Sequence, residues 1–263
     1  MNHQLAFRRT GAPSHLPLVL LHALPLDSTM WDKVRAELSD IDIITPDAPG
    51  FGNSGLAGTF GEPAILTYAQ ALKTTLDSLG VQRIALGGLS MGGAVAAEFV
   101  HQYPDMVAGL ALMDTNISAD TEEQRAYRFS IVEQADAGHG YDAIANWETT
   151  MLSPTVLPEV RSEMAALLQA APNEGLAWQL RAMAAREGRD DAVTLVNGPV
   201  YFIRGDTDAT SSLEYFMKLA LAAQQPRIIE IPAAGHFTAN EQPEALARAV
   251  RAFYSAASAA HSD

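Results

Sequence analysis

Short apolar runs alternate with helical patterns along most of the chain. The runs are rich in valine, isoleucine and leucine, and most are apolar at consecutive positions, as strands covered by helices on both faces must be. We predict strands at Leu18–His22, Ile41–Asp47, Arg83–Leu89, Ala108–Asp114, Val200–Asp206 and Arg227–Pro232. The segment Gln4–Thr10 instead alternates polar and apolar residues, which indicates a strand paired at an edge of the sheet.

Helical periodicity fills the intervals between these runs. Most of the helical patterns stop at a glycine or shortly before a proline, which are common helix ends. We predict helices at Tyr68–Leu79, Met91–Tyr103, Ser212–Gln224 and Pro243–Ser255. Strands that alternate with helices predict an α/β fold with a doubly wound, mostly parallel sheet.

The alternation stops between Thr115 and Val196, where helix signals recur without a strand pattern. Thr121 followed by two glutamates, and Pro158 followed by a third, are typical helix starts. We therefore predict a helical lid of residues 116–196, called the cap below, inserted after the sixth strand. The core is then formed by residues 1–115 and 197–255, and residues 256–263 are expected to form a flexible tail.

A Gly-x-Ser-x-Gly pattern at Gly88–Gly92 contains the candidate nucleophile, Ser90. An apolar strand leads into the pattern, and a helix of small residues leaves it. Such a sharp turn holds the serine in a strained conformation above the strand ends, and it requires small residues on both sides.

A serine nucleophile needs a base and an orienting acid, which in this architecture follow it along the chain in the order acid, histidine. Asp208 lies just past a strand end and is preferred over Asp206, which is better placed to bond the backbone of its own turn. Asp114 also follows a strand and stays open as an alternative acid. Of the seven histidines, His236 alone follows a late strand and precedes the last helix, so it is the predicted base.

Backbone N–H groups are expected to bind the oxyanion. Met91 supplies one of them directly after the nucleophile, and Leu24 the other, with Ala23 as the next candidate. The predicted substrate pocket is lined by Ala23, Trp147, Met151 and Met183. The candidate anchoring cations for a carboxylated lactone are Arg125, Arg128 and Arg181.

Together these motifs resemble the α/β-hydrolase fold-1 family of carboxylesterases, 3-oxoadipate enol-lactonases and cofactor-free haloperoxidases. The other matching stretches are His22–Trp31, Asp47–Ser54, Gly205–Asp208 and Gly235–Phe237. The resemblance implies a serine hydrolase that cleaves a small to medium ester or lactone through an acyl-enzyme, with Asp208 as the acid. Family members usually have glycine where this chain has Ala23. A non-catalytic or slow ligand receptor on the same scaffold, and a haloperoxidase or perhydrolase activity, remain alternatives.

The amino-acid composition excludes several kinds of partner and cofactor. The net charge of −14 argues against nucleic acid or an anionic membrane as a partner. The absence of cysteine removes disulfides and thiolate zinc sites, and no cofactor or metal is expected. Without an apolar leader segment, we expect a cytoplasmic protein acting on a small molecule. Gly50–Gly55 matches a dinucleotide-binding glycine pattern with Asp77 at a suitable distance, but a loop follows it where a helix is needed.

Overall fold

Seven strands form a single sheet in the computed structural model, which describes residues 3–56 and 60–261 of the chain. The strands are β1 (Phe7–Thr10), β2 (Leu18–Leu21), β3 (Ile43–Pro46), β4 (Ile84–Leu89), β5 (Val107–Met113), β6 (Pro199–Gly205) and β7 (Gln225–Ile231). Their order across the sheet is β1-β3-β2-β4-β5-β6-β7. β1 runs antiparallel to β3 at the edge, and every other pair is parallel, which confirms the predicted α/β class and edge strand.

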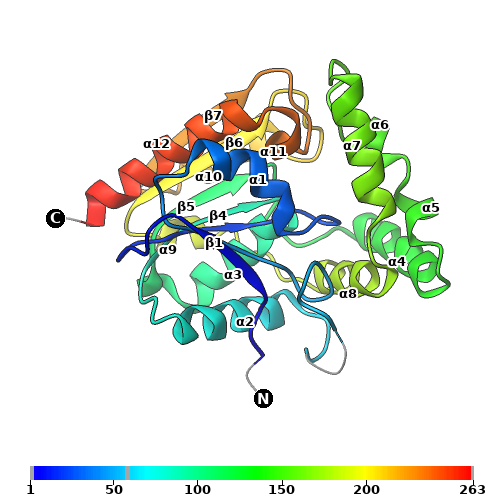
Figure 1. Cartoon of the computed structure of the whole chain (residues 1–263), viewed down its shortest axis with the longest axis horizontal. Coiled ribbons are helices and arrows are strands. Elements are labelled where there is room, and N and C mark those ends of the chain that lie inside the picture. The colour runs from blue at the N-terminus through cyan, green and yellow to red at the C-terminus, as the bar shows by residue number, and fades with distance from the viewer. Residues whose placement is uncertain (1–2, 57–59, 262–263) are drawn as a thin grey trace.

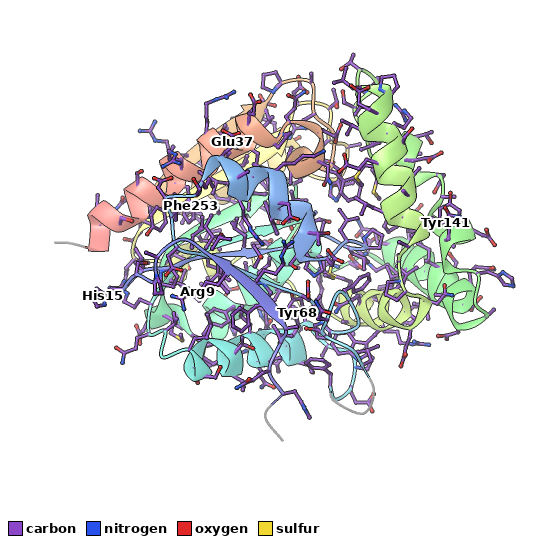
Figure 2. All side chains as sticks on the ribbon, viewed as in Figure 1. Arg9, His15, Glu37, Tyr68, Tyr141 and Phe253 are labelled. Atoms are coloured by element: carbon purple, nitrogen blue, oxygen red, sulfur yellow. The ribbon has the colours of Figure 1, made fainter. Side chains whose placement is uncertain are left out.

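Helices cover both faces of the sheet, as the consecutive apolar positions of the strands require (Figure 1). One face is covered by α2 (Ile65–Ser78), α3 (Met91–Gln102), α9 (Ala192–Leu195) and α10 (Leu213–Ala220), and the other by α1 (Asp32–Glu37) and α12 (Pro243–His261). Tyr68 of α2 and Phe253 of α12 mark the two apolar layers on opposite sides of the sheet (Figure 2).

Five further helices stand to one side of the sheet as a separate layer, drawn in green in Figure 1. They are α4 (Glu122–Asp136), α5 (Gly140–Ile144), α6 (Trp147–Thr150), α7 (Pro158–Gln169) and α8 (Asn173–Ala184). The helix start expected at Thr121 is confirmed, because its hydroxyl accepts the Gln124 N–H while the Gln124 side chain accepts the Thr121 N–H. α4 packs along α8, whereas α9 packs on α3 and so belongs with the core.

Two predictions about the cap and the tail are wrong. The helical segment follows β5, which is the fifth strand and not the sixth, because only five extended segments precede Asp114. The expected tail of residues 256–263 is helical as far as the described chain reaches, since α12 continues to His261. Alanines favour the helix, and Ala257 is buried over Gly109 of β5, so packing holds α12 as far as Ala257.

Candidate active site

Ser90 stands at the sharp turn between β4 and α3. Its φ of 55° and ψ of −117° lie in a region that side chains rarely adopt, so the surrounding structure must hold it there. A Cβ at Gly88 would collide with the carbonyl of Gly92, and a Cβ at Gly92 with the carbonyl of Leu21. The two glycines therefore allow the close approach of strand and helix that raises the Ser90 hydroxyl above the sheet edge.

The three residues predicted as nucleophile, base and acid meet at this edge. His236 Nε2 lies 2.8 Å from Ser90 Oγ, and His236 Nδ1 lies 3.2 Å from Asp208 Oδ1. His236 and Asp208 are both buried, at 4% exposure each. The hydroxyl, the imidazole and the carboxylate thus form a continuous chain of contacts, in which the imidazole can take the hydroxyl proton while the carboxylate orients the ring.

Hydroxyl groups that the sequence analysis did not single out surround the Asp208 carboxylate. Thr210 Oγ1 donates to Asp208 Oδ1 at 2.9 Å and lies 2.6 Å from His236 Nδ1, while Ser211 Oγ donates to Asp208 Oδ2 at 2.5 Å. Burial by itself raises the pKa of Asp208, but the facing His236, the Ser211 hydroxyl and the Thr210 N–H outweigh it, so the pKa lies well below its usual value. Asp208 is therefore ionised at neutral pH.

Asp114, the alternative acid, is fully buried and has other partners. Its Oδ1 accepts the Gly205 N–H at 2.7 Å, and its Oδ2 accepts the Thr238 hydroxyl at 2.5 Å. Burial and the nearby Asp208 charge raise the pKa of Asp114 well above its usual value. Asp114 makes no hydrogen bond to His236 within the described chain, and it ties the loops after β5, β6 and β7 together.

The pKa of His236 is shifted upward. Burial lowers it, but the charges of Asp208, Asp114 and Glu241 and the bond to Asp208 outweigh that effect. Glu241 was not identified from the sequence, although its carboxylate accepts three backbone N–H groups. Those groups belong to Ser153 of the cap and to Gly235 and Phe237 on either side of His236. Glu241 thereby fixes the histidine loop against the cap, and the His236 N–H donates to the Met151 carbonyl at 2.7 Å.

The backbone N–H groups predicted for the oxyanion have different surroundings. Those of Leu24 and Met91 donate to no residue in the described part of the chain, and both residues line the cavity above Ser90. The Ala23 N–H instead donates to Met30 Sδ at 3.2 Å, which leaves it unsuited to the role. His22 supports this loop from below, because its buried ring accepts the Ala48 N–H at 2.8 Å.

A cavity of about 370 Å³ lies between the sheet edge and the cap helices. Trp147, Met151 and Met183 line it together with Ser90 and His236, as expected of pocket residues. The prediction for Ala23 is wrong, since that residue does not line the cavity and is wholly buried in the core. The family difference at Ala23 is therefore accommodated by packing below the pocket.

The three candidate cations of the cap lie in different environments. Arg128 lines the cavity, whereas Arg181 pairs with Asp136 on the surface and Arg125 donates to the main-chain carbonyl of Asp120. Arg186, which the sequence analysis missed, lines the cavity beside Arg128. Two arginines therefore line the cavity, and only one of them was among the three candidates from the sequence.

The remaining motif residues do not join the site. Asp206 accepts the Ala234 N–H, and Asp77 lies within α2, where it pairs with Lys73 on the surface. Over residues 3–56 and 60–261, no group of three or more His, Asp or Glu side chains is placed to hold a metal ion. In the same ranges, no helix combines the length and apolar character needed to cross a membrane.

A doubly wound sheet with a serine at a strained strand-to-helix turn, and a histidine and an aspartate on nearby strand-end loops, defines the α/β-hydrolase class. The chain belongs to the alpha/beta hydrolase family, whose model matches residues 18–249.

Similar proteins of known structure include a thermophilic esterase from Thermogutta terrifontis, solved with malate bound, at 34% identity and a TM-score of 0.89. The match covers 96% of this chain and 93% of the esterase. An enol-lactonase from Burkholderia xenovorans shares the fold at 22% identity and a TM-score of 0.83, over 95% of this chain and 96% of its own.

Among curated proteins, the chain is 32% identical to an uncharacterised protein of Mycobacterium tuberculosis over 42% of its own length, a match that spans only 32% of that relative. It is 26% identical to the 2-succinyl-6-hydroxy-2,4-cyclohexadiene-1-carboxylate synthase of an Enterobacter strain, over 91% of this chain and 92% of the synthase.

Proposed function

We propose that the protein is a serine hydrolase that cleaves small to medium carboxylic esters or lactones through an acyl-enzyme at Ser90. The observation that carries the proposal is the chain of contacts from the Ser90 hydroxyl through His236 to Asp208, at 2.8 and 3.2 Å. The likeness to the Thermogutta esterase, at 34% identity over nearly the whole chain, supports ester cleavage.

In the first half of the reaction, Ser90 Oγ attacks the acyl carbon while His236 Nε2 takes the hydroxyl proton. The ionised Asp208 holds the imidazole in the required tautomer and stabilises the imidazolium that forms. The Leu24 and Met91 N–H groups receive the oxyanion, and each such donor typically contributes about 3 kcal/mol to transition-state stabilisation.

His236 then gives its proton to the departing alkoxide, which leaves the acyl group bonded to Ser90. A water molecule attacks this ester with His236 again acting as the base, and the second collapse releases the carboxylic acid and restores the serine. With a lactone the alkoxide stays attached to the acyl chain, so one hydroxy acid is released at the end.

The cap completes the site in this proposal. Residues 1–115 and 197–255 carry the reacting groups, and the cap encloses the substrate over the sheet edge with Trp147, Met151 and Met183. A cavity of about 370 Å³ suits a ligand of small to medium size.

Reaction with a fluorophosphonate and with p-nitrophenyl esters of increasing acyl length tests the proposal. We expect turnover of the short esters and a covalent adduct that mass spectrometry places on the peptide containing Ser90. The Ser90→Ala variant is the control and should give neither. An adduct without ester turnover would favour the receptor or perhydrolase alternative, and the absence of both would contradict a serine hydrolase.

A further inference from the structure

Two arginines and an aspartate of the cap form a buried cluster in the wall of the cavity. Asp120 Oδ2 accepts from Arg128 Nε at 2.5 Å, and Asp120 Oδ1 lies 2.6 Å from Arg186 Nη1. The side chains of Asp120 and Arg186 are 0% and 5% exposed, and that of Arg128 is 22% exposed. All three residues line the same cavity as Ser90 and His236.

The charges of this cluster do not balance. Two guanidinium groups face one carboxylate, which leaves one positive charge in the cavity wall. Burial and the neighbouring Arg128 lower the pKa of Arg186 to about 10 despite the attraction of Asp120, so Arg186 remains protonated at neutral pH. Asp114 also lines the cavity, but its raised pKa reduces its ability to supply the missing negative charge.

Hydrogen bonds to the backbone hold Arg186 in place, and both arginines keep N–H groups that have no acceptor in the described residues. Arg186 Nε donates to the Ser118 carbonyl at 3.1 Å, and Arg186 Nη1 donates to the Met183 carbonyl at 3.0 Å. Within the described residues, Arg186 Nη2 and Arg128 Nη1 donate no hydrogen bond. The cluster therefore presents fixed, unused donors together with an uncompensated charge.

Other arginines of the cap show the ordinary arrangement. Arg181 and Asp136 form a one-to-one pair with side chains 38% and 51% exposed, where water screens both charges. The charges of that pair balance, so it needs no further anion. Burying an unbalanced charge is costly unless a partner arrives, and planar guanidinium groups match a carboxylate with two parallel hydrogen bonds.

We infer that Arg128 and Arg186 form a carboxylate subsite, and that the substrate carries a carboxylate in addition to its ester or lactone bond. The inference rests on the proposed function, since it names the substrate class of the same site. The carboxylate completes the charge balance of the cluster and accepts the unused N–H groups of the two arginines. A neutral substrate of equal length leaves that charge without a partner.

Two pairs of matched substrates test the inference. Mono-p-nitrophenyl adipate is compared with p-nitrophenyl hexanoate for a carboxylate on the acyl side, and 4-acetoxybenzoate with 4-methylphenyl acetate for one on the alcohol side. We expect the protein to prefer the charged member of at least one pair. Arg128→Gln should lower kcat/KM for that charged ester by about 30-fold or more, because it removes one of two charge-assisted partners. Its kcat/KM for the neutral ester should fall much less, so that the preference for the charged ester is lost.

Arg181→Gln is the matched control, since it removes an arginine of the same cap outside the cavity, and it should leave the preference intact. Arg128→Lys should keep part of the preference, because it retains the charge but not the planar donor pair. Equal loss on charged and neutral esters in Arg128→Gln, or no preference in either pair, would overturn the inference.

Binding to the Ser90→Ala variant separates this inference from the proposed function. Calorimetric titration with glutarate should show binding that Arg128→Gln weakens by a similar factor, whether or not the unmodified protein turns over esters. Inactive protein that still binds glutarate through Arg128 would refute only the serine hydrolase. If the protein is active on esters but does not bind glutarate, or binds inorganic phosphate more tightly than glutarate, only the carboxylate subsite would be refuted.

Discussion

The strand-end loops of the core and the cap line the same cavity, but they differ in backbone conformation. Ser90, Asp114 and Ala233, which follow β4, β5 and β7, are the non-glycine residues with positive φ in the described part of the chain. The cap, described throughout residues 116–196, offers side chains from its helices and from the segments that flank them, and its non-glycine residues have ordinary backbone conformations. Strain persists only where surrounding structure determines it, so the sheet edge can hold reacting atoms more exactly than the cap can.

This contrast leads us to expect large losses of rate from substitutions at the sheet edge and changes of selectivity from substitutions in the cap. Glu241 joins the two regions, because it bonds the Ser153 N–H of the cap and the backbone beside His236.

Ser90→Ala should lower kcat for a short p-nitrophenyl ester by about a million-fold, as loss of the nucleophile does in other serine hydrolases. The variant should keep its thermal unfolding temperature, since the smaller side chain removes no buried packing. Steady-state kinetics and thermal unfolding check the two parts. Activity above about one per cent of the original would mean that Ser90 is not the nucleophile.

Asp208→Asn should lower kcat by about 10⁴-fold, because the amide no longer holds the correct imidazole tautomer. Asp114→Asn is the matched comparison at the neighbouring strand end, and we expect it to cost less than about tenfold, since Asp114 makes no hydrogen bond to His236. Kinetics of the two variants on one ester decide between the carboxylates. The reverse order of effects would assign the acid to Asp114.

The pH profile of kcat/KM should show the raised pKa of His236. The base acts only when the ring is neutral, so activity falls as the pH drops through this pKa, by about tenfold per pH unit below it. Because Asp208 and Asp114 raise the pKa above 6.5, the fall should begin at a higher pH than for an unperturbed histidine. In Asp208→Asn the midpoint should move to lower pH. An unchanged midpoint in that variant would mean that the profile reports another group.

Met183→Ala should enlarge the cavity and raise kcat/KM for octanoate esters relative to butyrate esters by about tenfold. One or two methylene groups typically change kcat/KM by about this factor in an apolar pocket. Met164→Ala is the control, since Met164 is a buried methionine of the cap that does not line the cavity. It should lower stability without altering the preference for chain length. Identical selectivity in the two variants would remove Met183 from the substrate pocket.

Much of the fold was predictable because its signals are local. The six apolar runs predicted after the first edge strand all coincide with strands of the structure, although the last of them, β7, forms the other edge of the sheet and is mostly exposed. The glycines around Ser90 indicate the sharp turn for a steric reason that the structure confirms. α1 was missed because six residues are too few to show a helical period.

The parts that were not predictable depend on packing between distant segments. Asp120 and Arg186 are separated by 66 positions and meet only because α4 packs along α8. Ala257 is buried because α12 extends across Gly109 of β5, although its local sequence is typical of an exposed end.

The sequence by itself determined the α/β class, the strained serine turn and the chain order of candidate acid and base, since each depends on residues adjacent in the chain. Only the tertiary structure decided which carboxylate contacts His236. Asp114 and Asp208 both follow strand ends, but Asp114 is bonded by Gly205 and Thr238, and Asp208 lies 3.2 Å from the ring. The same holds for the charge of the cavity. Burial and partners set the state of an ionisable group, and both come from residues that the chain brings together only when it folds.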